Sequence, residues 1–377
     1  MSHVHIARCP DYDEARVEDA IRGSVAALGG IAQFVKAGQR VILKPNLLRP
    51  TLAERHLTTH PAVVKAVVRL VQEADATPII MDSPAGPHNR AYLRLVYNTT
   101  GMEAVAQATG ATVNDDMRST RVPYPEGHLL KLIDMLAVVA EADAIINLPK
   151  LKTHNLTILT GAVKNLFGVI PGVTKAGYHG KLRTADRFAQ MLIDVTNYCH
   201  PVLTIMDAII GMEGNGPSVG DLREVGAILA SPDGIALDVV AASLVGMRPL
   251  SVPPLAVAAE WGLTTGRIED IRLSGVSLAK ARAWPPFALP KTAGQVRAER
   301  SRWTPFAKYL VVNPSANSHC SACGTCVRSC PVQAISIVDK CAHMDLDKCI
   351  RCYCCHELCP ENAVDLKRHW LAELILR

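Results

Sequence analysis

Two stretches near the C-terminus share one pattern of cysteines: CSACGTCVRSCPVQAISI at residues 320–337 and CIRCYCCHELCPENAVDL at residues 349–366. Both read C-x2-C-x2-C-x3-C-P, and both continue with Pro-x-x-Ala and alternating apolar residues. Thiolates at this spacing are typical of four-iron four-sulfur clusters, in which three cysteines of one stretch bind one cluster and the fourth binds the other. The repeat therefore predicts a small α+β ferredoxin-type domain with two 4Fe-4S clusters.

The predicted ligands are crossed between the two stretches. The first cluster takes Cys320, Cys323, Cys326 and Cys359, and the second takes Cys349, Cys352, Cys355 and Cys330. Structural zinc also uses cysteine pairs, but tetrahedral zinc sites seldom need two interlinked sets of this form, so zinc is the weaker alternative. Cys341 and Cys354 are left over. Packing is the favoured role for both, and tuning of a cluster potential is the other.

The composition is that of a soluble globular protein, with 49% hydrophobic and 20% charged residues in a chain of 377. The formal net charge is only +5 and no long basic run occurs, so nucleic acid and membrane surfaces are not expected partners. The N-terminus lacks the apolar stretch of a secretory signal. The most apolar region, Val225–Met247, is interrupted by Ser231-Pro232-Asp233-Gly234, so no transmembrane helix is expected. These features predict a cytoplasmic protein.

Residues 1–281 alternate short β-branched apolar runs with amphipathic stretches, a pattern typical of a parallel α/β sheet flanked by helices, in one body or two lobes. The predicted strands are Val4–Arg8, Arg40–Leu43, Thr77–Met81, Ala144–Asn147, Val202–Met206 and Val225–Ala230. The predicted helices are Asp13–Leu28, Pro61–Ala74, Ala91–Thr109, Ala185–Tyr198 and Gly234–Val245.

A proline-rich connection at residues 282–316 separates this α/β part from the ferredoxin-type domain at residues 317–377. Its aromatic residues need apolar surface to pack on, so we expect the connection to dock the ferredoxin-type domain rather than leave it free. The aromatic residues concerned are Trp284, Phe287, Trp303 and Phe306.

Polar clusters follow the predicted strands at their carboxyl ends. They are Lys44-Pro45-Asn46, Asp82 to Gly86, Asn147 to His154, Asp207 with Glu213 to Pro217, and Ser231 to Gly234. The carboxyl ends of parallel strands meet at one edge of the sheet, where loops and helix N-termini form the ligand site of open α/β folds. The sequence therefore predicts a ligand crevice at this edge.

The predicted crevice is rich in lysine, and ammonium groups on glycine-punctuated loops suit a carboxylate or phosphate. The predicted substrate-binding residues are Lys44, Asn46, Lys164, Asn165 and Lys175. Lys150, Lys152 and His154 are the candidates for catalysis, through anion binding and proton delivery. Asp82, Asp207 and Glu213 are candidates for a general acid or for orienting a lysine.

Two other kinds of site are weaker alternatives. His60, His154 and His179 could together bind a divalent metal, although loop histidines more often form local hydrogen bonds. The pattern Gly214-x-Gly216-x3-Gly220 follows a predicted strand, but Pro217 interrupts it and no helix follows directly. A functional turn is therefore favoured over a dinucleotide site.

Four short strings ahead of the ferredoxin-type tail resemble domain-of-unknown-function family 362, in its ferredoxin-fused members. They are KPN at residues 44–46, PKLKTH at 149–154, GAVKNLFG at 161–168 and EGNGP at 213–217. The resemblance covers nearly the whole chain and implies an iron–sulfur cluster-binding protein, with the eight cysteines as ligands. It implies no substrate.

The leading hypothesis is a cytoplasmic iron–sulfur oxidoreductase that passes electrons between a low-potential partner protein and an anionic small molecule at the lysine-rich crevice. In that case the ferredoxin-type domain must lie against the mouth of the crevice. One alternative is a non-enzymatic electron carrier or maturation partner. The other is a metal-dependent, non-redox enzyme acting on a hydroxy acid, with structural clusters.

Overall fold

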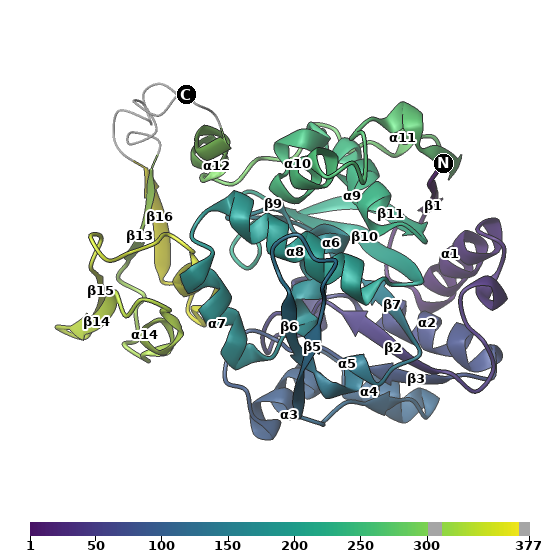
Figure 1. The fold of residues 1–377 in the computed structure, drawn as a ribbon, viewed down its shortest axis with the longest axis horizontal. Coiled ribbons are helices and arrows are strands. Elements are labelled where there is room, and N and C mark those ends of the chain that lie inside the picture. The colour runs from purple at the N-terminus through teal and green to yellow at the C-terminus, as the bar shows by residue number, and fades with distance from the viewer. Residues whose placement is uncertain (301–310, 369–377) are drawn as a thin grey trace.

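A ten-stranded, mostly parallel sheet forms the centre of the computed structural model, which describes residues 1–300 and 311–368 (Figure 1). The main order is β12-β1-β11-β10-β7-β2-β3-β4, and β8 pairs with both β10 and β9. The strands are β1 (His3–Arg8), β2 (Arg40–Pro45), β3 (Thr77–Ile80), β4 (Thr112–Val113), β7 (Ala144–Leu148), β8 (Lys150–His154), β9 (Ile158–Leu159), β10 (Leu203–Glu213), β11 (Asp221–Ser231) and β12 (Arg272–Gly275). All six predicted strands are present, so the α/β prediction is confirmed.

Alternate residues of the central strands pack on opposite faces of the sheet, as the period of two in a strand requires. Ile42 and Ile145 belong to one buried apolar cluster, whereas Leu43 and Ile146 belong to the other. One face is covered by α1 (Glu14–Ala27), α2 (Pro61–Glu73), α3 (Arg90–Thr99) and α4 (Met102–Thr109). The other is covered by α5 (Ala137–Ala140), α6 (Gly161–Asn165), α8 (Ala185–Cys199), α9 (Gly234–Leu244) and α10 (Pro253–Glu260).

The predicted helix Ala91–Thr109 is wrong as a single element. It is broken at Gly101, whose φ of 78° is left-handed, and α3 and α4 lie on either side of it. The sequence analysis also missed the hairpin of β5 (Ser119–Pro123) and β6 (Leu132–Leu136), as well as α7 (Gly172–Lys181). No helix among the described residues is long and apolar enough to span a membrane.

Strand β11 runs opposite to its neighbours β10 and β1. The cluster from Ser231 to Gly234 therefore lies at the opposite edge of the sheet from the other polar clusters, and its predicted place in the crevice is wrong. There the hydroxyl of Ser2 donates to the Asp233 carboxylate at 2.6 Å, and the hydroxyl of Ser231 donates to the carbonyl of His3 at 2.8 Å. The reversal arises because the turn between β10 and β11 is too short for a crossover.

The C-terminal part, which we call the cysteine module (residues 312–368), shows the internal repeat in three dimensions. Two five-residue helices, α14 (Thr325–Ser329) and α15 (Cys354–Leu358), occupy equivalent places in the two stretches. Each follows a left-handed residue, Gly324 with φ 72° and Tyr353 with φ 62°. Two small antiparallel sheets complete the module: β13 (Val312–Ala316) with β16 (Val364–Arg368), and β14 (Ile335–Val338) with β15 (Cys341–Met344).

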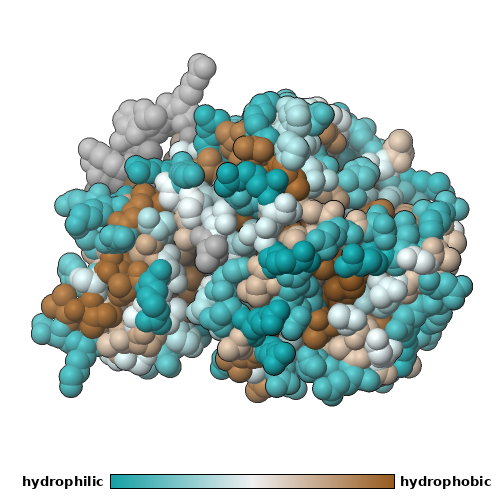
Figure 2. All heavy atoms as spheres, turned by 60° about the horizontal axis from the view of Figure 1, so that its bottom comes forward, coloured by the Kyte–Doolittle hydropathy of each residue, from teal (hydrophilic) through white to brown (hydrophobic). Residues whose placement is uncertain are grey.

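The surface of the module is more apolar than most of the face shown in Figure 2, where brown atoms gather on the left of the molecule and teal predominates over the body. Ile337, Val338 and Leu346 are among the exposed large hydrophobic residues of the module. The module is too small to bury all of its apolar side chains in a core of its own, so part of this surface stays open to solvent.

The connection contains α12 (Ala293–Arg300) and contacts both parts of the molecule. Phe287 is 5% exposed and packs in the core of the body, as predicted. Trp284 is 82% exposed, so the prediction that it packs is wrong. Trp303 and Phe306 lie outside the described residues. Thr292 donates to the carbonyl of Asn155 at 2.6 Å, which ties the connection to the body next to β8.

Candidate functional site

A cavity of about 760 Å³ lies between the body and the cysteine module. The body contributes the loop after β2, the loop after β3, and helices α6 and α7. The module contributes α14 and α15 with the residues that follow α15. The module therefore lies against the crevice at the carboxyl edge of the sheet, where the sequence predicts the ligand site.

Three predicted lysines, Lys44, Lys164 and Lys175, line this cavity. Lys44 is 1% exposed, and its Nζ lies 2.8 Å from Oδ1 of Asp82. Burial lowers the pKa of Lys44, although the Asp82 charge opposes that shift. Gly168 lies directly against this ion pair, because a Cβ at that position would overlap with both Asp82 and the end of the Lys44 side chain.

Lys164 and Lys175 approach the cavity from α6 and α7. Burial lowers the pKa of Lys164, and it lowers the pKa of Lys175 to about 7. Lys175 donates to the carbonyl of Ser83. Lys164 forms no hydrogen bond or ion pair within the described residues, and its Nζ lies 4.9 Å from the centre of the Phe167 ring. Its ammonium group is therefore available to a ligand at the wall of the cavity.

The position of Lys164 depends on a buried carboxylate beneath α6. Gly161 begins this helix with a left-handed φ of 52°, where a Cβ would overlap with the carboxylate of Asp238. Asp238 accepts from the amides of Ala162 at 2.6 Å and Val163 at 3.0 Å. Burial raises the pKa of Asp238 to about 7, and the two amide hydrogen bonds oppose that rise.

A chain of three amides fixes the orientation of Asn46. Asn147 donates to the carbonyl of Ala162 at 3.0 Å, and Asn165 donates to Asn147 Oδ1 at 2.8 Å and to the carbonyl of Lys44 at 3.0 Å. Asn46 in turn donates to Asn165 Oδ1 at 3.0 Å. Because carbonyls can only accept, the direction of the whole chain is determined. Oδ1 of Asn46 is left without a hydrogen-bond partner among the described residues.

Lys150 and Lys152 lie on β8 and do not line the cavity, in contrast to their predicted roles. Lys150 lies 2.9 Å from Asp207 Oδ2 and donates to the Tyr12 hydroxyl at 2.5 Å. Lys152 donates to the carbonyl of Leu57 at 2.8 Å, and burial lowers its pKa to about 7. Both are almost fully buried, and the partners named here are residues of the body.

The predicted acidic residues have different surroundings. Asp82 lines the cavity as the partner of Lys44. Asp207 forms an ion pair with Lys150, and it accepts hydrogen bonds from the hydroxyl of Tyr12 at 2.8 Å and from the amide of His60 at 3.0 Å. Glu213 lies 2.9 Å from Arg223 and does not line the cavity.

His154 forms part of the contact between body and module. Its Nδ1 accepts from the amides of Leu156 at 3.0 Å and Thr157 at 3.3 Å, so the ring proton is on Nε2. Nε2 lies 3.3 Å from Oε1 of Glu357 on α15. Burial lowers the pKa of His154 well below its ordinary value and raises the pKa of Glu357 to about 7. Glu357 itself lines the cavity.

Sequence reasoning missed three arginines that line the cavity. Arg49, which is 8% exposed, donates to the carbonyl of Cys359 and, at 3.0 Å, to Asn362 Oδ1, so it bridges body and module. Arg55 lies in the same loop, and Arg328 lies on α14. The signal in the sequence was the loop Arg49-Pro50, which follows the Lys44-Pro45-Asn46 string closely.

The three histidines that could bind a metal do not converge. His60 stacks on Tyr12 with ring centres 3.9 Å apart, and His179 stacks on Phe188 at 4.5 Å. Among the described residues, no group of three His, Cys, Asp or Glu side chains could hold a single metal ion. The glycine pattern forms a hairpin: Gly216 lies against Thr153, where a Cβ would overlap with the carbonyl oxygen. A second strand follows it, not the helix of a dinucleotide site.

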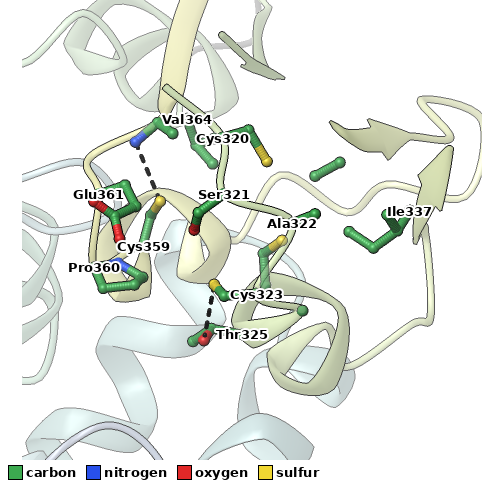
Figure 3. Close-up of a pocket in the computed structure, with 14 residues that line it drawn as sticks. Cys320, Ser321, Ala322, Cys323, Thr325, Ile337, Cys359, Pro360, Glu361 and Val364 are labelled. Atoms are coloured by element: carbon green, nitrogen blue, oxygen red, sulfur yellow. Dashed lines mark hydrogen bonds between the residues drawn. The ribbon is translucent and has the colours of Figure 1, made fainter. Parts of the chain in front are cut away.

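The structure brings the four cysteines predicted for the first cluster to one place, and the crossed ligand assignment stays a prediction. Cys320, Cys323, Cys326 and Cys359 line one small cavity, and in Figure 3 the sulfur atoms of Cys320, Cys323 and Cys359 surround the same space. Cys330 lies close enough to Cys349 to contribute to the raised pKa of the Cys349 thiol, which is due chiefly to burial. The amide of Ala363 donates to Cys359 Sγ at 3.1 Å, and that of Ala334 donates to Cys330 Sγ at 3.2 Å.

This donor set fits four-iron clusters. Soft thiolates are the ligands that iron–sulfur clusters use, and hydrogen bonds to sulfur are among the features that set their potentials. None of the twelve cysteines is in a disulfide. The leftover Cys354 is buried and lines the large cavity, and Cys341 lies on β15.

Two family models match the chain: "Domain of unknown function (DUF362)" at residues 41–243 and "4Fe-4S binding domain" at residues 317–336. A thylakoid-associated protein of Synechocystis sp. is 36% identical over 318 residues, which is 83% of this chain and 97% of that protein. One subunit of an ion-translocating oxidoreductase complex of Methanosarcina acetivorans is 35% identical over 48 residues, 13% of this chain and 18% of that protein.

A more distant likeness is to the structure of the lactate racemase apoprotein from Thermoanaerobacterium thermosaccharolyticum. The TM-score is 0.39 at 12% identity, over 62% of this chain and 55% of the other. The 4Fe-4S family model covers the first cysteine stretch as far as Ser336. The chain belongs to the DUF362 family and carries a C-terminal 4Fe-4S binding domain.

Proposed function

We propose that the protein is a cytoplasmic iron–sulfur oxidoreductase that transfers electrons between a low-potential partner protein and an anionic small molecule bound in the cavity. The observation that carries this proposal is the shared wall of the cavity. The body contributes Lys44, Lys164 and Lys175, and the module contributes residues within or beside the cysteine stretches. These module residues include Thr325, Cys354, Glu357 and Pro360. A simple electron carrier has no need of such a cavity.

In this proposal the eight crossed cysteines hold two 4Fe-4S clusters. Such clusters supply one-electron chemistry, and the protein supplies binding, orientation and charge. The three cavity lysines bind the anion. The wall between the cavity and the first group of cysteines is thin, since Thr325 and Pro360 line both cavities.

The residues of the cavity can also supply protons. Lys175 has a pKa near 7, so it exists in both protonation states at neutral pH and can give or accept a proton at its Nζ. His154 stays neutral, with its Nε2 3.3 Å from Oε1 of Glu357. Lys150 and Lys152 position β8 and have no contact with the ligand in this proposal.

The test uses the full chain with reconstituted clusters under anaerobic conditions. The protein is reduced chemically, and the return of the visible absorbance is followed after addition of 2-oxo acids or unsaturated carboxylates, whose C=O or C=C bonds can accept the electrons. At least one class should reoxidise the protein, and Lys164→Gln should slow that reaction at least about tenfold with unchanged iron and sulfide content. Lys280→Gln, at an exposed position outside the cavity, is the matched control.

Two outcomes would count against the enzyme. If no anion reoxidises the protein or alters the spectra of its clusters, the electron-carrier alternative gains. If Lys164→Gln behaves like Lys280→Gln, the reaction does not take place in this cavity.

A further inference from the structure

We infer that the ligand of the cavity is an elongated organic molecule with anionic groups at both ends, one bound by lysines of the body and the other by arginines at the module boundary. This inference rests on the proposed function and narrows its substrate class from an anion to an organic dianion with an apolar middle. The arrangement of charge around the cavity carries it.

The first anionic group is bound at the body side. Lys44, Lys164 and Lys175 come from β2, α6 and α7 and lie close enough that Lys44 and Lys164 each lower the pKa of Lys175. The carboxylate of Asp82, which lies beside them, is already paired with Lys44. Glu357 on α15 acts electrostatically on Lys164, but no carboxylate forms an ion pair with Lys164 among the described residues. An incoming anion would relieve the repulsion between the lysines.

The second anionic group is bound at the module side. Arg49 reaches the module through the carbonyl of Cys359, and Arg55 lies near enough to Arg49 to lower its pKa. Arg328 faces the same cavity from α14. Arg55 is exposed, and no hydrogen bond or ion pair holds its side chain among the described residues. Guanidinium groups bind carboxylates and phosphates with two parallel hydrogen bonds, which suits the end of a ligand.

The basic residues and the size of the cavity favour a ligand with more than one anionic group over a small monoanion. Six lysine and arginine side chains line the cavity, but only two acidic side chains do. The volume of about 760 Å³ is in the range of sites for molecules of drug size, roughly 300–1,000 Å³. Apolar side chains make up much of the remaining wall, which suits a hydrocarbon spacer. They include Leu48, Pro84, Phe167, Leu358 and Pro360.

The probes are α,ω-dicarboxylates from malonate to suberate, each compared with the monocarboxylate of the same carbon number. Binding to the full chain with its clusters is measured by calorimetry at constant ionic strength. We expect an optimum chain length at which the dicarboxylate binds at least about tenfold more tightly than its monocarboxylate. Arg55→Gln should remove that advantage and leave monocarboxylate binding unchanged, whereas Lys164→Gln should weaken both.

The control is Arg248→Gln, which replaces an exposed arginine outside the cavity and should change neither monocarboxylate nor dicarboxylate binding. Equal binding of mono- and dicarboxylates at every length, with both sensitive to Lys164→Gln, would overturn the two-ended ligand while leaving the proposed function intact. Binding of neither, at concentrations up to tens of millimolar, would overturn both. If Arg55→Gln and Arg328→Gln still bind the dicarboxylate more tightly than its monocarboxylate, the arginines do not bind the second anionic group.

Discussion

Replacing Asp82 by Asn should destabilise the protein strongly at neutral pH and much less at alkaline pH. The variant removes the carboxylate 2.8 Å from Lys44 Nζ, and the lysine is then left in a site where it is 1% exposed. Breaking a buried pair by removing one partner costs about 3–5 kcal/mol. The lysine can avoid that cost by losing its proton.

The free energy needed to deprotonate Lys44 sets an upper limit on the stability that Asp82→Asn can lose, and this limit depends on pH. From an unfolded pKa of about 10.4, releasing the proton costs about 4.6 kcal/mol at pH 7 and about 1.9 kcal/mol at pH 9, at about 1.36 kcal/mol per pH unit. The folded variant then binds one proton fewer than the unfolded chain, so its stability rises with pH in this window. Asp82 raises the pKa of Lys44 in the wild type and so reduces this pH dependence.

Urea unfolding followed by circular dichroism at both pH values, under anaerobic conditions, checks this prediction. The loss of stability should be about 3–5 kcal/mol near pH 7, and smaller by at least about 1 kcal/mol near pH 9. Asp134→Asn, which breaks an exposed pair with Arg121, is the control and should cost less than about 1 kcal/mol at either pH. A cost for Asp82→Asn below about 1 kcal/mol, or one independent of pH, would refute the reasoning.

Three further predictions concern the cysteines, the docking contact and the cavity. Cys330→Ser should damage the cluster of the second stretch, and Cys359→Ser should damage the cluster of the first stretch. Iron and sulfide analysis with electron paramagnetic resonance measures which cluster is lost. Loss confined to the cluster of the residue's own stretch would contradict the crossed assignment. Arg49→Ala removes two hydrogen bonds to the module, so hydrogen exchange in α15 should accelerate about tenfold, and unchanged exchange would contradict the docking role. Sulfate binding should weaken from about pH 6 to about pH 8, because Lys175, with a pKa near 7, loses its charge. Calorimetry should show a flatter pH profile for Lys175→Met. An unchanged profile would mean that Lys175 does not cause the pH dependence of sulfate binding.

The buried strands were predictable because each is a short apolar run with β-branched residues, which are enriched in β-strands. Strand β8 could not be predicted in this way, because Lys150, Lys152 and His154 give it no apolar periodicity. Its polar side chains are satisfied by partners more than fifty residues away, such as Asp207, and a local pattern cannot show such partners. The direction of β11 was missed for a related reason: an apolar run is the same in a parallel and an antiparallel strand.

The site was predicted on the body side and missed on the module side. The position of Lys44 at the end of a strand is enough to bring it to the carboxyl edge. Glu357 has the sequence position of a spacer between ligand cysteines, and its role depends on the docking of two separate parts of the chain. The same holds for Arg328. Docking geometry follows from the contact surfaces as a whole, which the order of residues along the chain does not show.

The contact between Arg49 and the module has a consequence for how cysteine variants can be interpreted. The acceptor is the main-chain carbonyl of Cys359, and every amino acid supplies that oxygen whatever its side chain. A substitution at position 359 therefore removes the sulfur and keeps the anchor. Such a variant can therefore lose the sulfur ligand without losing the chemical group that Arg49 binds. The contact between body and module at this point thus depends on the main chain of position 359 and not on its side chain.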